Sequence, residues 1–166
     1  MLSSCLRRIG TFALLTAAFA AFSLAATAQA PTPARTRLVR LMQAAHLDYK
    51  TTESPTTFVI LFAGDNIKDG KLILTVSDDE DSELVMFVTI ASKNQIPKSS
   101  ALQFKLLKAN YEYDYVKIGF DNDDDLSMRI DTSLRLADAR FLGNMVTQLE
   151  KASDELYGKL QPSLLR

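Results

Sequence analysis

Beyond residue 36, the spacing of apolar residues alternates between a helical period and a strand period. Apolar residues recur at three- and four-residue steps from Leu38 to Ala45, which predicts an amphipathic helix that ends near Leu47. The dipeptide Asp69-Gly70 between two apolar runs is typical of a β-hairpin. Short apolar, β-branched runs predict three strands, over residues 57–62, 71–77 and 83–91.

The second half of the chain shows the same change of period. Ser99 or Ser100 can cap a helix that runs to about Ala109. Alternation of apolar and polar residues then predicts two half-buried strands, and helical spacing from Asp138 to Leu160 predicts a long closing helix. The positions expected to face the core are Val116, Ile118 and Phe120 in the first strand and Leu126, Met128 and Ile130 in the second.

The predicted order of elements is α-β-β-β-α-β-β-α. Adjacent strands with helices before, between and after them indicate an α+β domain, in which helices pack on an antiparallel sheet. A length of 166 residues also favours one domain rather than two. We place this single domain at residues 37–161, followed by a tail at residues 162–166.

The predicted middle helix has two apolar faces. At 100° per residue, Leu102, Leu106 and Ala109 share one face, whereas Phe104 and Leu107 lie on a quite different one. The first face can pack on the sheet, and the second then needs a partner, which makes it a candidate surface for self-association. The alternative is that the helix is covered on both faces within the monomer.

Three tyrosines follow this helix at alternate positions. In an extended chain, Tyr111, Tyr113 and Tyr115 would point in one direction, opposite in phase to the core-facing residues of the next strand. Tyrosine combines a large contact area with a polar tip and therefore suits recognition surfaces. A packed connector between helix and strand is the alternative. Glu112 and Asp114 between the rings would repel phosphate, which argues against nucleic acid.

The first 28 residues have the three-part layout of a secretory signal peptide. Arg7 and Arg8 form a positively charged n-region, and an apolar run from Ile9 to Leu24 is followed by small residues. This run is shorter than the roughly 20 residues of a membrane-spanning helix. We expect cleavage after Ala28, a flexible leader at residues 29–36, and a periplasmic or secreted protein. An uncleaved N-terminal anchor is the alternative.

Composition narrows the chemistry further. The formal net charge is −1, so the chain lacks the basic field that nucleic-acid binding needs. One cysteine and one histidine are too few for a zinc site or a nucleophile with its base. Cys5 leaves with the signal peptide, and His46 is expected to be a surface or capping residue at a helix end. We therefore expect no catalytic residue, no bound metal and no cofactor.

Two acidic tracts need a separate interpretation. Residues 121–125 place acidic side chains as a calcium loop does, but Leu126 and Thr132 stand where that loop needs Gly and Glu. We expect this tract, and the one at residues 78–81, to form solvated turns between strands. If the two loops met at one end of the sheet, they could hold a divalent cation weakly.

Three segments carry a resemblance to a known family. They are the helix end LQFKLLKAN at residues 102–110, the hairpin VKIGFDNDDDLSMRIDTSL at residues 116–134, and ASDEL at residues 152–156 of the closing helix. Over residues 36–161 the chain resembles the YbjN family of bacterial sensory-transduction regulators, whose wider group has the fold of type III secretion chaperones. The resemblance implies a domain that binds other proteins, often as a dimer, without catalysis.

The sequence therefore predicts an exported, non-enzymatic protein- or peptide-binding domain with a regulatory or chaperone-like role in the cell envelope. Its partner would be another envelope protein or peptide, or a second copy in a homodimer, with no nucleic acid and no stable membrane insertion. A partner could add a strand to an exposed sheet edge or cover the middle helix. A divalent-ion or small-molecule sensing domain is the alternative. The candidate partner surface is Phe104, Leu107, Tyr111, Tyr113 and Tyr115.

Overall fold

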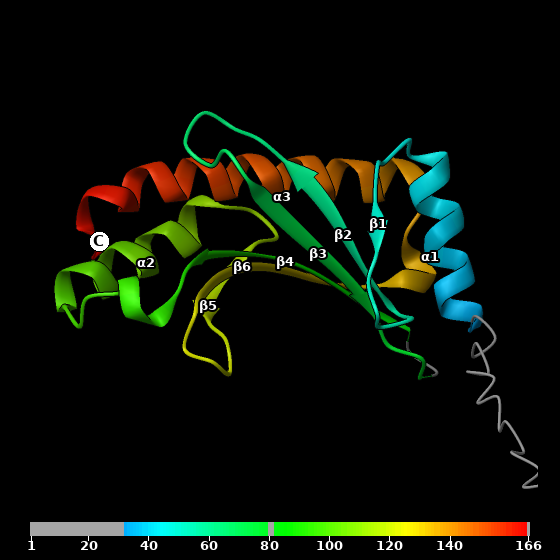
Figure 1. The fold of residues 1–166 in the computed structure, drawn as a ribbon, viewed down its shortest axis with the longest axis horizontal. Helices are drawn as coiled ribbons and strands as arrows, with labels where there is room; N and C mark the ends of the chain where they lie inside the picture. Colours follow the sequence, from blue (N-terminus) through cyan, green and yellow to red (C-terminus); the bar gives the residue numbers. More distant parts are fainter. Residues whose placement is uncertain (1–31, 80–81, 166) are drawn as a thin grey trace, which may run out of the picture.

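The computed structural model describes residues 32–79 and 82–165, which form one sheet with helices packed against it (Figure 1). The expected signal peptide and its cleavage after Ala28 lie outside the described residues. In chain order the elements are α1 (Pro33–Ala44), β1 (Lys50–Thr51), β2 (Thr57–Phe62), β3 (Gly70–Val76), β4 (Glu83–Ala91), η1 (Lys93–Gln95), α2 (Ser100–Glu112), β5 (Lys117–Phe120), β6 (Leu126–Ser133), η2 (Leu134–Leu136), α3 (Ala139–Leu160) and η3 (Gln161–Ser163).

The described strands form one six-stranded sheet in the order β1-β2-β3-β4-β6-β5, and all neighbouring strands are antiparallel. Strand β6 lies between β4 and β5, so the β5–β6 hairpin is attached to the first four strands through β6. The predicted α+β class and element order are confirmed. The two-residue strand β1 is an addition that the apolar pattern does not reveal.

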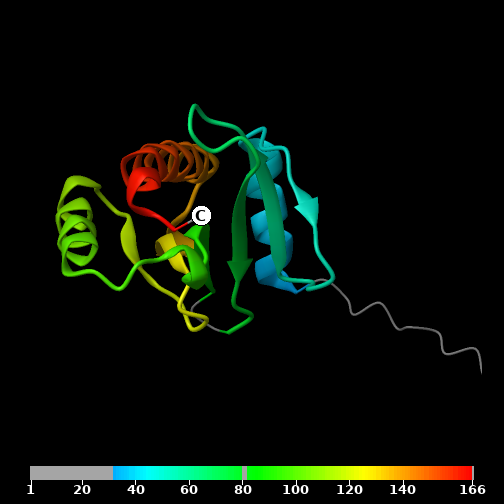
Figure 2. The same cartoon turned by 60° about the vertical axis from the view of Figure 1, so that its left-hand side comes forward.

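Every second residue of the four central strands faces the helices. Phe58, Leu74, Met86 and Ile130 stand side by side in register on β2, β3, β4 and β6, and all are buried. Helix α3 packs on β3, β4 and β6, while α1 packs on β3 and on α3. Helices α1 and α2 lie at opposite ends of the molecule (Figure 2). The helices complete the core with the buried residues Leu38, Met42, Leu142, Leu149 and Leu156.

Helix α1 begins earlier than the sequence suggests. Thr32 caps it by accepting a hydrogen bond from the Arg35 N–H at 3.2 Å, and Pro33 occupies the first turn. Residues 33–36, expected to belong to a flexible leader, are therefore helical. The helix ends at Ala44, and His46 adopts a left-handed φ of 54° in the turn that follows, which places it at the helix end as expected.

A carboxylate of α3 holds the loop between β2 and β3. Asp154 accepts hydrogen bonds from the backbone N–H groups of Asp65, Asn66 and Ile67, at 3.1, 2.8 and 2.7 Å. A Cβ on Gly64 would overlap the Asp154 carboxylate, so glycine allows the close approach. The loop is thereby fixed on the helix by one side chain.

Replacing Asp154 with Asn should destabilise the protein in a pH-dependent way. Burial raises the pKa of Asp154, but the loop N–H groups outweigh burial, so the pKa lies below its usual value. The carboxylate therefore stabilises the fold above roughly pH 4 and loses this contribution as the pH falls through its folded-state pKa. Asp154→Asn should lower the free energy of unfolding at pH 7 by about 1–2 kcal/mol.

Urea unfolding at neutral and acidic pH measures this effect. The difference between wild type and Asp154→Asn should shrink as the pH falls below roughly 4. Glu155→Gln is the matched control because it removes a neighbouring carboxylate that makes no hydrogen bond to the loop. A difference that stays constant in acid would show that the charge of Asp154 does not hold the loop.

Candidate interaction surfaces

Helix α2 has the two apolar faces that its sequence predicts. Leu102, Leu106 and Ala109 are buried, whereas Phe104 is 61% exposed and Leu107 is 69% exposed. Within residues 32–79 and 82–165, the helix is therefore not covered on both faces. Ser99 caps its start by accepting a hydrogen bond from the Leu102 N–H. Lys108 extends over the Phe104 ring, 5.3 Å from its centre, and leaves most of the ring accessible.

The expectation of three tyrosines along one extended face is wrong. Helix α2 continues to Glu112, so Tyr111 lies on the helix and is 94% exposed. Tyr113 turns inward, is half-buried and lies beneath the Lys159 ammonium, 5.4 Å from the ring centre. Tyr115 is 75% exposed, in a left-handed conformation with a φ of 64°.

The structure thus groups only part of the predicted surface. Phe104, Leu107 and Tyr111 are spaced at i, i+3 and i+7 and form one exposed stripe along α2, which we call the α2 ridge. Tyr113 belongs to the packing between α2 and α3. Tyr115 lies in the connection that follows the helix.

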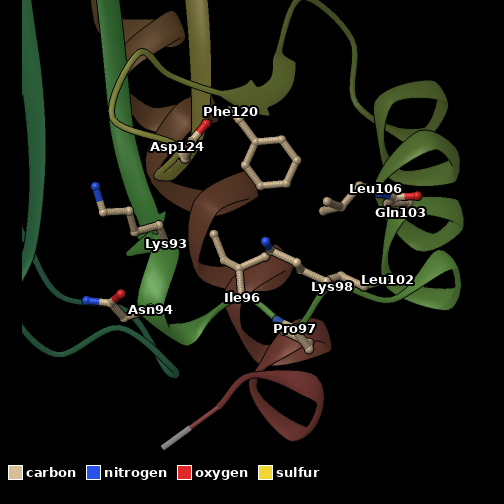
Figure 3. A pocket seen from close by; sticks show the side chains of 10 residues that line it. All are labelled: Lys93, Asn94, Ile96, Pro97, Lys98, Leu102, Gln103, Leu106, Phe120 and Asp124. Atoms are coloured by element: carbon tan, nitrogen blue, oxygen red, sulfur yellow. The ribbon is translucent and has the colours of Figure 1, made fainter.

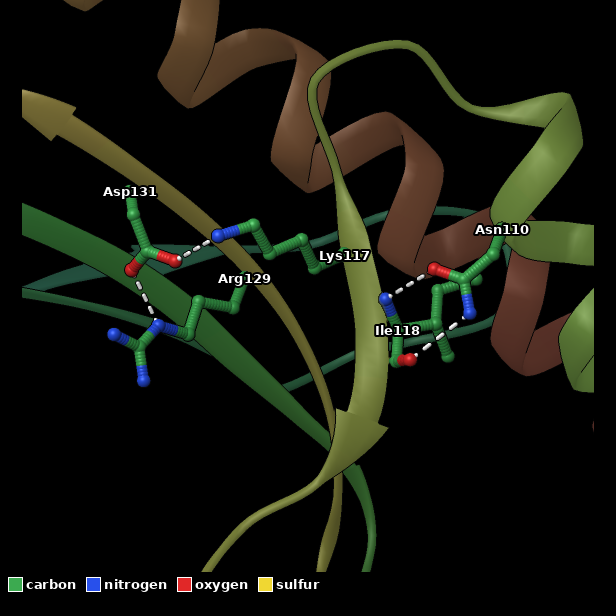
Figure 4. A network of polar contacts seen from close by, with 5 residues as sticks. All are labelled: Asn110, Lys117, Ile118, Arg129 and Asp131. Carbon is green, nitrogen blue, oxygen red and sulfur yellow. Dashed lines mark hydrogen bonds and ion pairs between the residues drawn. The ribbon is translucent and has the colours of Figure 1, made fainter.

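The free edge of β5 is partly closed by α2. The Asn110 amide accepts a hydrogen bond from the Ile118 N–H at 2.7 Å and donates one to the Ile118 carbonyl at 2.9 Å (Figure 4). A neighbouring strand would make the same two bonds. The sequence suggests that a partner could add a strand to an exposed edge, but at Ile118 of β5 the backbone groups that such a strand would use already bind Asn110. At the other edge of the sheet, β1 covers Phe58 and Val59 of β2.

Asn110→Ala should open this edge. It would leave both backbone groups of Ile118 without their protein partner and lower the free energy of unfolding by about 1–3 kcal/mol. Hydrogen exchange at the Ile118 amide should become faster by more than the change in global stability explains. Gln103→Ala serves as the control, since Gln103 is an exposed amide of the same helix. Unchanged exchange at Ile118 would contradict the role of Asn110.

The sheet face opposite α3 forms a second surface, which the sequence analysis did not identify. Val59, Ile73 and Phe87 stand in register across β2, β3 and β4, and all three are half-buried. The same row continues with exposed Arg129 on β6 and Lys117 on β5. No helix among residues 32–79 and 82–165 covers this row, which we call the bare face.

One carboxylate organises the cationic end of the bare face. Asp131 accepts a hydrogen bond from the Lys117 ammonium at 2.8 Å and another from Nε of Arg129 (Figure 4). Burial raises the pKa of Asp131, but the two cations outweigh burial and lower the pKa below its usual value. Asp131 is therefore ionised at neutral pH and fixes the position of both cations.

A groove of about 640 Å³ lies between the start of α2 and the β5–β6 loop. Ile96, Leu106 and Phe120 point toward one another across it, and Lys98 reaches into it (Figure 3). Phe120, expected to face the core, is instead 51% exposed. Phe120 is the last residue of the edge strand β5 and lines the groove, whereas its cross-strand neighbour Leu126, on the inner strand β6, is buried.

The strand residues that follow the two acidic tracts lie at opposite ends of β4. Glu83, which follows the first tract, pairs with Ser133, whereas Ala91 at the other end of β4 pairs with Leu126, which follows the second tract. Nine residues of β4 separate these ends, a distance of about 25–30 Å. The described residues of the two tracts therefore do not meet, and the described part of the chain contains no group of three or more possible metal-ligating side chains.

One pair of carboxyl groups on α3 has opposite pKa shifts. Burial raises the pKa of Glu150, while the pKa of Asp154 is lowered, and both line a hollow of about 390 Å³ beside the β2–β3 loop. Opposite shifts are typical of acid and base partners in enzymes. Here, however, both oxygens of Asp154 accept hydrogen bonds from the loop, which gives the shift a structural cause.

Among the described residues, none of the helices combines the length and the apolar character that a membrane-spanning helix needs.

Comparison with known proteins places this fold. The family model YbjN, described as "Putative bacterial sensory transduction regulator", matches residues 34–162. The fold is similar to that of YbjN from E. coli, a putative transcription regulator, with 14% identity and a TM-score of 0.53, covering 79% of this chain and 95% of that one. No curated protein matches significantly.

Two solved complexes share the fold. The ExoU–SpcU heterodimer from the type III secretion system of Pseudomonas aeruginosa gives 17% identity and a TM-score of 0.50, covering 76% of this chain and 95% of that chain. The HopA1–SchA chaperone–effector complex gives 14% identity and a TM-score of 0.50, covering 72% of this chain and 88% of that chain. At sequence identities of 14% and 17%, this similarity is a similarity of fold alone.

Proposed function

Because the chain belongs to the YbjN family, we propose that it is a non-enzymatic domain that binds another envelope protein or peptide in a regulatory or chaperone-like role. The α2 ridge supports the protein-binding part of this proposal, in the form of self-association, since it exposes three large apolar side chains on one face of one helix. Similar folds occur in a chaperone–effector complex and in a type III secretion heterodimer, which supports protein binding.

The proposed occupant of the α2 ridge is a second copy of the chain. A two-fold axis brings the same surface of each copy together, so a stripe of Phe104, Leu107 and Tyr111 can pack against itself. Burial of an exposed large apolar side chain contributes about 1.5–3 kcal/mol. Lys108 can keep its ammonium in water while its stem lies along the ring.

An envelope location is part of the proposal. It rests on the signal-peptide pattern of residues 1–28, with a positive start, a short apolar run and small residues at Ala26 to Ala28. Without its first 28 residues the chain would contain no cysteine, as suits a protein that works without thiol chemistry in an oxidising compartment.

Small-molecule sensing is a second candidate function, favoured by the groove at the start of α2. Its volume of about 640 Å³ lies within the range of small-molecule sites. Divalent-ion sensing by the two acidic tracts is less favoured, because the strand residues that follow them lie at opposite ends of β4.

Phe104→Glu tests the α2 ridge. A carboxylate at this position would repel its symmetry mate and cannot be buried without cost, so the variant should be a folded monomer. The wild type should be a dimer by sedimentation at tens of micromolar. Gln43→Glu adds the same charge at an exposed position on α1, at the opposite end of the molecule from α2, and should stay dimeric. A monomeric wild type at this concentration would exclude self-association here.

A crosslinking pull-down from envelope extract tests the wider function. With residues 29–166 as bait, mass spectrometry should identify one dominant partner at near-stoichiometric yield. Baits carrying Phe104→Glu and the control Gln43→Glu, with folding verified by circular dichroism, show whether capture needs the α2 ridge. An empty pull-down with folded wild-type bait would contradict the protein-binding function and favour metabolite screens on the groove.

A further inference from the structure

The bare face combines an apolar half with a cationic end. Val59, Ile73 and Phe87 supply the apolar half, and Arg129 and Lys117 stand next in the same cross-strand row. Side chains directly opposite on antiparallel strands have Cβ atoms about 4.5–5.5 Å apart. The change from apolar to cationic character therefore occurs within one strand spacing, between Phe87 and Arg129.

A hollow of about 400 Å³ lies at this junction. Phe87, Ser127 and Phe120 contribute to its lining, together with Arg129 and Lys117. A Cβ added at Gly119 would meet no atom within 4 Å, so the space above this glycine on β5 is open. The hollow is large enough for one aromatic or large aliphatic side chain that enters from solvent.

Beside this hollow, Asp131 positions the Arg129 guanidinium so that its terminal nitrogens can bind an anion. Asp131 occupies its Nε, while its two terminal nitrogens have no hydrogen-bond partner among the described residues. Two terminal nitrogens of one guanidinium match the two oxygens of a carboxylate. Lys117 and Arg129 carry two positive charges, and Asp131 and Asp121 carry two negative ones. The attraction for a carboxylate therefore depends on the direction of the Arg129 donors and not on a net positive charge. Asp121 also lines the hollow, and its Oδ1 accepts two backbone N–H groups of its own loop.

We propose that the bare face binds an extended peptide segment in which a large apolar residue and an acidic residue are two positions apart. In an extended chain, residues i and i+2 point to the same side and lie about 6.6 Å apart. The apolar side chain would fill the hollow beside Phe87, and the carboxylate would bind the terminal nitrogens of Arg129. This inference rests on the proposed peptide-binding function and specifies the chemistry of the partner.

A selection from random short peptides displayed on phage tests this proposal with the purified protein as target. Enriched peptides should carry Asp or Glu two positions from Phe, Leu or Ile. Amide shifts of the labelled protein on addition of the most enriched peptide should map to β4, β5 and β6. No enrichment, enrichment without the acidic residue, or shifts confined to the α2 ridge or the groove would each overturn the proposal.

Matched variants separate the charge contact from general electrostatics. Arg129→Gln should weaken binding of the enriched peptide about fivefold or more, and Glu→Gln in the peptide should weaken it equally. The two changes together should cost little more than either alone. Lys71→Gln removes a charge from the same sheet face without touching Asp131 and should have a small effect. Equal losses for Lys71→Gln and Arg129→Gln would overturn the specific contact.

The outcome is distinguishable from a failure of the proposed function. Phe104→Glu disrupts the α2 ridge on a different element from the bare face and should leave peptide affinity unchanged. If enriched peptides bind only through the α2 ridge, protein binding stands and the bare-face proposal fails. If no peptide or protein binds at all, both fail.

Discussion

The two-residue period that runs in register through β2, β3, β4 and β6 is the constraint on which the rest of the structure depends. It places Phe58, Leu74, Met86 and Ile130 in one buried row and sends every intervening residue to the opposite side. A shift of one residue in any pairing would exchange these two sets. Because the described helices use only one side, the core has one layer of helices and the sheet keeps a second, accessible surface. Both the stability and the surface chemistry of the domain follow from this one-sided burial.

Helix α2 extends this arrangement beyond the sheet edge. Its inward face contacts the domain through Leu102, Leu106 and Ala109, and Asn110 makes two hydrogen bonds to the backbone of Ile118. An edge strand is otherwise open to unwanted pairing, and a side-chain amide at its centre restricts that. The same attachment fixes which side of α2 remains outside, because Phe104 lies on the opposite side of the helix. The exposed stripe is therefore a consequence of how the edge strand is protected.

The sequence predicts the element order and the two faces of α2 because these depend on local period. The sequence does not predict which alternate residues of a strand are buried where the run is apolar throughout. TFVILF in β2 and ELVMFVTIA in β4 are apolar on both sides, so they do not reveal that Phe58 is buried and Val59 is not. Strands β5 and β6 alternate with Lys, Arg and Asp, and there the buried phase is predictable except at Phe120, which is exposed, and Ser127, which is buried. The sequence predicts an end of α2 near Ala109, whereas the helix continues to Glu112, because the alternation of tyrosines with acidic residues fits an extended chain as well as a helix.

The two candidate surfaces differ in the chemistry that they offer. The α2 ridge is a convex stripe of large side chains, which suits symmetric contact with an identical stripe. The bare face is one surface of the pleated sheet, and its distinguishing feature is a polar contact. Asp131 holds Arg129 through Nε and leaves the terminal nitrogens of the guanidinium available. A fixed donor loses less conformational entropy on binding than a mobile one, so it discriminates between partners by charge and position. Self-association and partner choice can therefore reside on separate surfaces of one small domain.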